Sequence, residues 1–197
     1  MRCIADKPLF VAAGDAEPAH VPDDAALLIT GIGTLPAAIS LTEVLTEARL
    51  RDEMPSRVVN IGTAGALHDG LAGVFEVDAV TKHDFKLEVL SDLGKYLLPE
   101  RIELPTSRRL PVRTLATGDF FVSDTQTRNR LAQESALCDM EGYSVAAVCQ
   151  RFEVPCTLLK QVSDPADESS VGTWAGVLDR GARQLMSAVT DLGLLPR

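Results

Sequence analysis

The stretch that decides the fold spans residues 139–167 and reads Asp139-Met140-Glu141-Gly142, a helical segment, Val154-Pro155, an apolar run, and Ser163-Asp164-Pro165-Ala166-Asp167. Its apolar spacing predicts a helix over Met140–Phe152, followed by a strand over Cys156–Val162. Glu141 then lies in the first turn of a helix, and Asp164 lies just past the end of a strand. Either acid alone is ordinary, because acids are common at both kinds of position. Their order and spacing within one segment are the diagnostic feature.

Apolar runs and helix-period segments alternate along the rest of the chain. The expected strands are Leu9–Ala13, Ala26–Thr30, Arg57–Ile61, Val74–Thr81, Val112–Ala116 and Cys156–Val162. The expected helices cover residues 35–50, residues 123 or 124 to about 135, Met140–Phe152, and about Thr173 to Leu192. Residues 86–111 contain three prolines and are expected to cross the surface. This alternation predicts one α/β domain over residues 1–197, with a sheet between two helical layers.

The composition excludes several classes of protein. Hydrophobic residues make up 46% and charged residues 24%, which is the balance of a soluble globular domain. The net charge of −9 argues against nucleic acid as a partner, because phosphate neutralisation needs clusters of Lys and Arg. No run of about 20 apolar residues is present, so no membrane segment is expected. The apolar run Leu9–Ala13 is followed by Asp15 and Glu17, and it is more typical of a strand than of a signal peptide.

The cysteines and histidines indicate neither disulfides nor a metal site. The four cysteines form no C-x-x-C pair, and three of them fall in apolar segments. This pattern favours buried free thiols in a reducing compartment, so we expect a cytoplasmic protein. The three histidines are scattered, and no His/Cys cluster has the spacing of metal ligands.

Two glycine-containing segments follow expected strands. Gly31-Ile32-Gly33 lacks the third glycine of a dinucleotide fingerprint, because Pro36 stands in its place, and a tight strand-to-helix turn is favoured. Gly62-Thr63-Ala64-Gly65 is not a Walker loop, because no Gly-Lys-Ser/Thr follows. Its small residues fit either a turn with positive φ or a close approach to a ligand, in which the Thr63 hydroxyl can bond a ribose oxygen. Neither segment predicts a cofactor.

Gly118-Asp119-Phe120-Phe121 ends a further expected strand, at the kind of edge where ligands collect in α/β sheets. An aromatic face can stack there on a flat heterocycle, although core packing is the more ordinary explanation for phenylalanine. Glu141 and Asp164 add two carboxylates. Cleavage of a nucleoside needs such a pair, since one carboxylate holds the sugar hydroxyls and the other delivers a proton to the departing base.

Taken together, these segments resemble the purine nucleoside phosphorylase and nucleosidase superfamily, and within it the methylthioadenosine/S-adenosylhomocysteine nucleosidases most. The matching segments are Thr30-Gly31-Ile32-Gly33, Asn60-Ile61-Gly62-Thr63-Ala64-Gly65, Thr117-Gly118-Asp119-Phe120-Phe121, and the stretch 139–167. The resemblance implies a three-layer α/β/α fold with a mixed central sheet, no cofactor, and a homodimer or higher homo-oligomer.

The resemblance also assigns roles to the two acids and a neighbour. Asp164 matches the general acid of the family, which protonates the purine so that it leaves as a neutral base. Glu141 matches the carboxylate that holds the ribose hydroxyls while the sugar passes through an oxocarbenium-like state. Met140 matches a residue that packs against the sugar.

Four further positions match binding residues of the family. Phe121 matches the aromatic residue that stacks on the base, and Val122 matches a residue whose backbone groups meet the purine edge. Thr63 falls where the nucleosidases often carry Ser, near the ribose and the water. Trp174 lies about where the family supplies an apolar wall for the 5′ substituent, although a lone Trp is more often a core residue.

The nucleophile distinguishes hydrolysis from phosphorolysis. A phosphorylase binds a dianion with arginines, and that branch commonly has one two residues before the strand-end glycine, where this chain has Asn60. The branch also carries Gly-Asp-Pro-x-Arg near its N-terminus, where this chain reads Gly14-Asp15-Ala16-Glu17-Pro18. We therefore expect hydrolysis, with Glu17 as the general base that activates water and Asp15 as the alternative.

The function expected from the resemblance is a purine nucleosidase. It would hydrolyse the N-glycosidic bond of an adenine nucleoside such as 5′-methylthioadenosine or S-adenosylhomocysteine. Two alternatives lie within the same superfamily: hydrolysis of futalosine or another 5′-modified nucleoside, and phosphorolysis of a purine nucleoside. A third alternative is a non-catalytic nucleoside-binding protein, which the short segment between Glu17 and Leu27 suggests because the family normally has a hairpin there.

Overall fold

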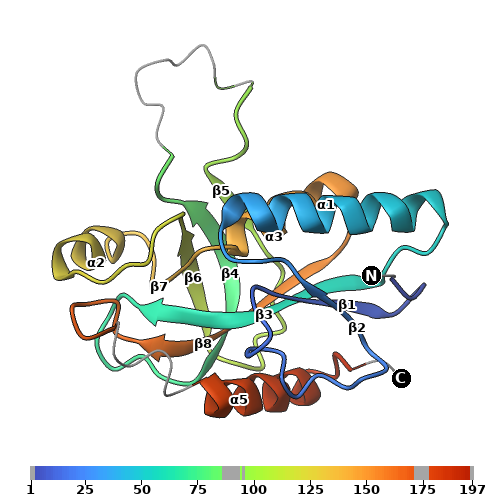
Figure 1. Ribbon diagram of the computed structural model, residues 1–197. Coiled ribbons are helices and arrows are strands. Elements are labelled where there is room, and N and C mark those ends of the chain that lie inside the picture. Colours follow the sequence, from blue (N-terminus) through green and yellow to red (C-terminus); the bar gives the residue numbers. More distant parts are fainter. Residues whose placement is uncertain (1–2, 86–93, 95, 171–177, 196–197) are drawn as a thin grey trace.

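The computed structural model describes residues 3–85, 94, 96–170 and 178–195 (Figure 1). These residues form an eight-stranded sheet with helices on both faces. The strands are β1 (Pro8–Ala12), β2 (Ala26–Ile29), β3 (Arg57–Ala66), β4 (Val74–Lys82), β5 (Arg101–Glu103), β6 (Val112–Thr117), β7 (Leu137–Asp139) and β8 (Cys156–Asp164). The helices are α1 (Thr34–Leu50), α2 (Thr125–Leu131), α3 (Gly142–Phe152) and α5 (Leu178–Asp191).

The sheet is mixed, and part of it closes on itself. β3 is parallel to β1 and β8 and antiparallel to β7. β4 is parallel to β6 and antiparallel to β5 and β8. Because β6 also pairs with β7, the strands β3, β8, β4, β6 and β7 form a closed circuit of pairings. The expected α/β fold with a mixed central sheet between helical layers is confirmed.

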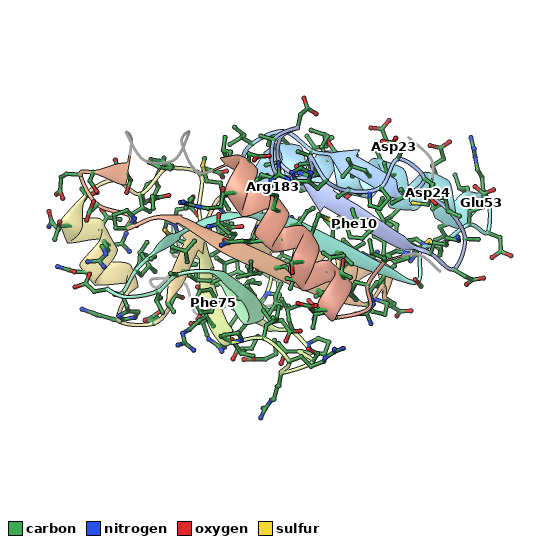
Figure 2. All side chains as sticks on the ribbon, turned by 90° about the horizontal axis from the view of Figure 1, so that it is seen from below. Phe10, Asp23, Asp24, Glu53, Phe75 and Arg183 are labelled. Atoms are coloured by element: carbon green, nitrogen blue, oxygen red, sulfur yellow. The ribbon has the colours of Figure 1, made fainter. Side chains whose placement is uncertain are left out.

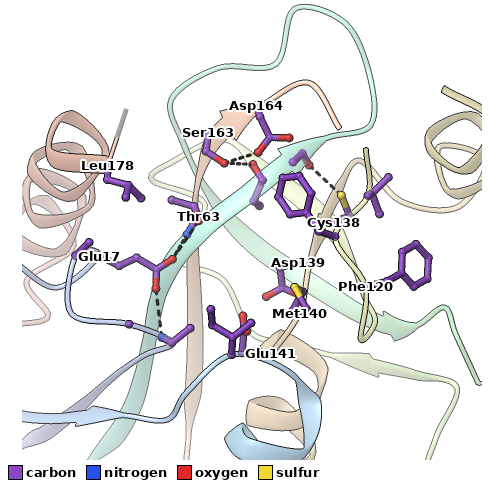
Figure 3. Close-up of a pocket in the computed structure, with 18 of the residues that line it drawn as sticks. Glu17, Thr63, Phe120, Cys138, Asp139, Met140, Glu141, Ser163, Asp164 and Leu178 are labelled. Atoms are coloured by element: carbon purple, nitrogen blue, oxygen red, sulfur yellow. Dashed lines mark hydrogen bonds between the residues drawn. The ribbon is translucent and has the colours of Figure 1, made fainter. Parts of the chain in front are cut away.

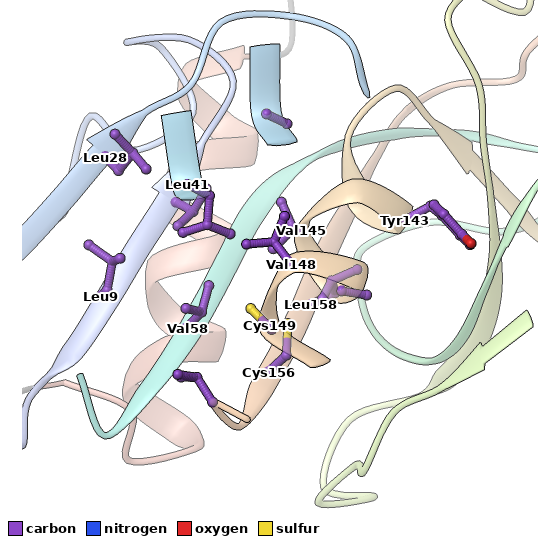
Figure 4. Close-up of a cluster of buried hydrophobic side chains, with 14 of the residues drawn as sticks. Leu9, Leu28, Leu41, Val58, Tyr143, Val145, Val148, Cys149, Cys156 and Leu158 are labelled. Carbon is purple, nitrogen blue, oxygen red and sulfur yellow. The ribbon is translucent and has the colours of Figure 1, made fainter. Parts of the chain in front are cut away.

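Two hydrophobic cores hold α1, α3 and α5 to the sheet. α1 and α3 cover one face and α5 covers the other (Figures 1 and 2). Side chains alternate along β3, so Val58 packs in the core beneath α1 and α3 while Val59 packs against α5. In the first core Leu41 of α1 lies near Val145 of α3 (Figure 4). In the second core Leu185 of α5 is fully buried.

The start of α3 differs from the sequence expectation in a way that matters for the site. The helix begins at Gly142, two residues later than expected, and Glu141 is its N-cap residue rather than part of its first turn. Asp139 Oδ2 accepts a hydrogen bond from the Gly142 N–H at 2.9 Å, and Thr117 Oγ1 accepts one from the Tyr143 N–H at 2.9 Å. Side chains of β6 and β7 thus satisfy backbone donors that would otherwise be orphaned, and the Glu141 side chain makes no capping bond to α3.

Other boundaries shift by a few residues. Asp124 is the cap of α2, since its Oδ1 accepts a hydrogen bond from the Thr127 N–H at 2.7 Å, and α2 ends at Leu131 rather than near residue 135. The strands β5 and β7 were not expected, because three residues carry no periodic signal, and β5 lies in the segment 86–111 that was expected only to cross the surface. The final helix is described from Leu178 onward, and its expected start near Thr173 lies outside the described residues.

Residues 62–65 lie inside β3, and the expectation that β3 ends before them is wrong. Neither Gly62 nor Gly65 has a positive φ, so the glycines do not form a turn. A β-carbon at Gly65 would lie 2.9 Å from Cys138 Sγ and 2.9 Å from Ala166 Cβ, which no real side chain tolerates. These glycines therefore serve the close approach of neighbouring side chains. By contrast, Gly31 and Gly33 have φ values of 84° and 104°, which confirms the tight strand-to-helix turn before α1.

All four cysteines are buried and free, as expected. Among the helices in the described part of the chain, none is both long enough and apolar enough to cross a bilayer.

Candidate active site

A cavity of about 650 Å³ opens at the end of the strand circuit where β6, β7 and β8 finish (Figure 3). Its size is typical of small-molecule sites. The lining residues are 13–17, Ile32, 63–65, 120–122, 138–141, Ser163, Asp164 and Leu178. The structure therefore brings together seven of the eight residues proposed from the sequence, namely Glu17, Thr63, Phe121, Val122, Met140, Glu141 and Asp164. Trp174 lies outside the described residues.

Glu17 is held against β3 by hydrogen bonds to both of its carboxylate oxygens. Oε1 accepts from the Thr63 N–H at 2.7 Å and from the Thr63 hydroxyl at 3.1 Å, and Oε2 accepts from the Ala13 N–H at 3.2 Å. The side chain is 9% exposed. Asp15, the alternative base, lines the cavity but is exposed. The geometry therefore favours Glu17 as the carboxylate that faces a buried reactant.

Glu141 points away from its own helix and toward the start of α1. Its Oε1 accepts a hydrogen bond from the Gly33 N–H at 2.8 Å. Burial raises the pKa of Glu141 to about 7, and the neighbouring Asp139 carboxylate adds to the rise, while Lys160 and the Gly33 N–H oppose it. A carboxyl group with this pKa is available near neutral pH both as an acceptor and as a donor toward hydroxyl groups.

Asp164 is the last residue of β8 and is 5% exposed. Its Oδ1 accepts a hydrogen bond from the Ala166 N–H at 2.9 Å, and its Oδ2 accepts one from the Ser163 hydroxyl at 2.7 Å. Figure 3 shows Asp164 across the cavity from Glu141, with Thr63 and Glu17 along one side. Two donors thus fix the orientation of the carboxyl group at the cavity wall.

Phe120 and Phe121 line the cavity with exposed fractions of 40% and 44%. Core packing, the more ordinary explanation for phenylalanine, does not account for residues this exposed. Stacking on a flat ligand stays a prediction for this segment. Phe120 makes an edge-on contact with the buried ring of His83, whose centroid lies 4.9 Å away. Burial lowers the pKa of His83, which keeps the ring neutral against the aromatic face.

Sequence reasoning missed an ion pair directly beneath the site. Lys160 Nζ lies 2.8 Å from Asp139 Oδ2, and both side chains are 1% exposed. Asp139 Oδ1 also accepts a hydrogen bond from the Thr117 hydroxyl at 2.6 Å. Burial alone would lower the pKa of Lys160, but the carboxylates of Asp139, Glu141 and Glu17 outweigh burial and raise it. The sequence feature that could have revealed this pair is a lysine in the middle of an apolar strand. An unpaired ammonium is almost never buried, so such a lysine implies an acidic partner.

A second missed residue is Asp119, which helps to cap α1 from a distant part of the chain. Its Oδ1 accepts a hydrogen bond from the Thr34 N–H at 2.6 Å, while Glu141 accepts from the adjacent Gly33 N–H. Gly33 is the N-cap residue of α1 and has no side chain to cap the helix. Two carboxylates from other segments therefore occupy the positive end of this helix.

Comparison with known proteins identifies the family to which this chain belongs. The family model described as the Phosphorylase superfamily matches residues 23–192. The 5′-methylthioadenosine nucleosidase of Arabidopsis thaliana is 32% identical over 152 residues, which make up 73% of this chain and 55% of that protein. The match thus spans little more than half the length of that relative. Glu17 precedes residues 23–192, which the family model matches, so its place in the site rests on the geometry described above.

Solved structures share the fold. The MTA/SAH nucleosidase of Streptococcus pneumoniae in complex with 8-aminoadenine matches with a TM-score of 0.81 at 17% identity, over 96% of this chain and 100% of that chain. A futalosine hydrolase mutant of Helicobacter pylori matches with a TM-score of 0.80 at 22% identity, over 96% of this chain and 99% of that chain. The resemblance found in the sequence is confirmed at the level of family and fold.

We expect the contribution of Glu141 to stability to fall as the pH rises. Its pKa is raised from 4.5 to about 7 on folding, so the folded state binds more protons than the unfolded state between these values. The free energy of unfolding of the wild type, relative to Glu141→Gln, should therefore decrease by up to about 3 kcal/mol between pH 4.5 and 7. Urea unfolding across this range measures the difference. Glu134→Gln, an exposed control, should show no such trend, and a difference that rises with pH for Glu141→Gln would contradict the assignment.

The buried ion pair should show strong coupling in a double-mutant cycle. Lys160→Met should lower the free energy of unfolding by about 3–5 kcal/mol, because it leaves Asp139 buried without its partner charge. Adding Asp139→Asn should recover part of this loss. Lys82→Met is the matched control. Lys82 is partly exposed, pairs with Asp84 at 2.6 Å and lies 3.7 Å from Asp119 Oδ2, and its replacement should cost less than about 1 kcal/mol. Equal losses for the two lysines in chemical denaturation would refute a special role for the buried pair.

Proposed function

Because this chain belongs to the phosphorylase superfamily, we propose that it is a nucleosidase that hydrolyses the N-glycosidic bond of an adenine nucleoside, such as 5′-methylthioadenosine or S-adenosylhomocysteine. The observation that carries the proposal is the meeting of Glu17, Glu141 and Asp164 in one cavity. The similarity to the 5′-methylthioadenosine nucleosidase of Arabidopsis thaliana supports this choice of substrate.

The mechanism uses each carboxyl group for a different step. Asp164, oriented by the Ser163 hydroxyl and the Ala166 N–H, donates a proton to N7 of the purine. The bond between N9 and C1′ then breaks, and the bonding electrons leave with the neutral base. Glu141 holds the ribose hydroxyls while positive charge develops on the sugar. Glu17 takes a proton from the water whose oxygen bonds to C1′, so the products are adenine and the free sugar.

The remaining lining residues fit the substrate around these groups. Phe121 stacks on the base, and the backbone of Val122 meets the purine edge. Met140 packs against the sugar, and the Thr63 hydroxyl, which already contacts Glu17, lies where the ribose and the water meet. Trp174, which the resemblance matches to an apolar wall for the 5′ substituent, lies outside the described residues.

Hydrolysis is favoured over phosphorolysis by the charge of the cavity. The charged residues among its described lining are all acidic: Asp15, Glu17, Asp139, Glu141 and Asp164. A phosphate dianion needs cationic or multiple neutral donors, and acids in contact with it would repel it. Glu17 is also in place to activate water, which weakens the alternative of a binding protein without activity. Futalosine hydrolysis stays the second candidate, because the Helicobacter pylori futalosine hydrolase mutant shares the fold.

Release of adenine should require no phosphate. We expect the protein to liberate adenine from 5′-methylthioadenosine at the same rate with and without inorganic phosphate, measured by chromatography of the free base. Asp164→Asn should lower kcat by about 10²–10⁴-fold, because it removes the proton donor while keeping the shape. Asp191→Asn makes the same change at an exposed position of α5 and serves as the control. Strict dependence on phosphate would identify a phosphorylase instead.

We also propose that the protein is a homo-oligomer. Ile32, Leu35 and Ile39 lie on one face at the start of α1 and are 63%, 66% and 57% exposed. Ile32 also lines the cavity, so this apolar face is continuous with the mouth of the site. A second copy of the chain would bury the face and narrow the mouth at the same time.

Sedimentation at micromolar concentration should therefore show a dimer or a larger homo-oligomer. Leu35→Glu should shift the protein toward the monomer, because it places a charge in the centre of the apolar face. Leu50→Glu introduces the same charge at the far end of α1, where Leu50 is 83% exposed, and should leave the assembly intact. A monomeric wild type would overturn the proposal.

A further inference from the structure

Two consecutive residues just past the end of β4 lie behind the aromatic segment of the cavity, residues 118–121. This segment follows β6, and β4 runs parallel to β6 with Lys82 in register with Thr117. The pairing continues for one more residue, because the His83 N–H donates a hydrogen bond to the Thr117 carbonyl oxygen at 3.0 Å. His83 and Asp84 therefore stand beside the aromatic segment. Neither of them lines the cavity itself.

We propose that His83 and Asp84 are positioning residues, which hold the aromatic segment in the conformation that binds the purine base. The inference rests on the proposed nucleosidase function, because it takes Phe121 as the residue that stacks on the base. It deepens that function by assigning part of the affinity for the base to two side chains outside the cavity lining.

The His83 ring supports the aromatic segment by its shape. A β-carbon at Gly118 would lie 2.4 Å from both Cε1 and Nε2 of His83, so the backbone of residue 118 packs directly on the imidazole. The same ring meets Phe120 edge-on, with ring centroids 4.9 Å apart. His83 is 9% exposed, and neither ring nitrogen has a hydrogen-bond partner among the described residues. The ring thus acts on the segment through packing and not through a hydrogen bond.

Asp84 holds the same segment by its backbone. Its Oδ2 accepts a hydrogen bond from the Asp119 N–H at 2.7 Å, and its Oδ1 accepts one from Lys82 Nζ at 2.6 Å. Burial alone would raise the pKa of Asp84, but these hydrogen bonds outweigh burial and lower it, so the acceptor is ionised at neutral pH. A hydrogen bond to an ionised acceptor is stronger than one between neutral groups.

These contacts fix the part of the chain that leads into the two exposed phenylalanines. Figure 3 shows Phe120 on the side of the cavity opposite Glu17. Binding to a segment that is already ordered avoids the loss of conformational entropy that ordering it would cost. A looser segment should therefore bind the base less tightly. The carboxyl groups of Asp164 and Glu141 should be unaffected, because Ser163, Ala166 and Gly33 hold them in place.

Adenine affinity and steady-state kinetics test both residues. Asp84→Ala removes the acceptor of the Asp119 N–H, and His83→Ala removes the ring that packs on Gly118 and Phe120. For each variant we expect the Kd of adenine, measured by titration calorimetry, and KM for 5′-methylthioadenosine to rise together by about 3–10-fold. By contrast, kcat should stay within about threefold of the wild type, because the groups assigned to proton transfer and to the sugar are unchanged.

Conservative replacements separate positioning from folding. Asp84→Asn keeps an oxygen acceptor and His83→Phe keeps an aromatic ring, so each should bind adenine more tightly than the corresponding alanine variant. Asp69→Ala is the matched control. Asp69 pairs with Arg128 Nη2 at 2.6 Å, follows β3 and does not line the cavity, so its loss should leave Kd and KM unchanged. A loss of folded protein would lower the apparent kcat without raising KM or the Kd of adenine.

The outcomes separate this inference from the proposed function. If the wild type releases adenine but Kd and KM are unchanged in an alanine variant, the positioning role of that residue is overturned and the nucleosidase function stands. A fall in kcat at constant KM, or an equal loss of affinity in Asp69→Ala, would overturn it as well. If the wild type binds adenine but cleaves no nucleoside, the nucleosidase function fails, and the adenine titrations still decide the positioning role. A wild type that neither cleaves nor binds overturns both.

Discussion

The site depends on a positive charge buried inside the circuit of strands. Lys160 projects from β8 to Asp139 at the end of β7, and the nearby carboxylates of Glu141 and Glu17 feel the same ammonium. Without it, three buried acids would lie near one another with no cation to offset their mutual repulsion. A buried ion pair is weak evidence for added stability. Here its consequence is that several carboxylates can lie close together at one cavity, with a cation beside them that offsets part of their charge.

Asp139 also links several elements of the fold through its carboxylate. Besides Lys160, its carboxylate accepts hydrogen bonds from the Thr117 hydroxyl and the Gly142 N–H, so β6, β8 and the start of α3 meet at one side chain. Because Asp139 accepts the bond from the Gly142 N–H, the Glu141 side chain does not cap its own helix. It accepts a hydrogen bond from the Gly33 N–H at the start of α1 instead. Asp119 binds the next donor along, on Thr34. The segment that carries the exposed phenylalanines and the carboxylate assigned to the sugar are thus fixed to the same helix end.

The sequence predicted the layered fold well because its strands and helices have clear and different periodicities. It predicted the meeting of Asp164 and Phe121 because both follow expected strands, and strand ends converge in α/β sheets. The resemblance to the family, rather than a strand end, brought Glu141 to the same site. The residues that it missed, Lys160 and Asp119, act through partners far away in the chain, and no local pattern announces such contacts. The lysine between Leu159 and Gln161 did signal a buried charge, but it did not identify its partner. β5 and β7 were missed because three residues are too few for a period. The closure of the strand circuit depends on pairings between distant segments, which spacing does not encode.

Gly65 lies where side chains of β7 and of the end of β8 approach β3 most closely. The position where its β-carbon would stand is 2.9 Å from Cys138 Sγ on β7, 2.9 Å from Ala166 Cβ and 3.3 Å from Asp164 Oδ1. A hydrogen atom there allows β7 and the segment after β8 to lean on β3 from opposite sides. A methyl group would push apart the wall that carries Asp164 and the wall that leads from Cys138 to Met140 and Glu141. The separation of Asp164 and Glu141 across the cavity is therefore set in part by the one carbon that Gly65 lacks.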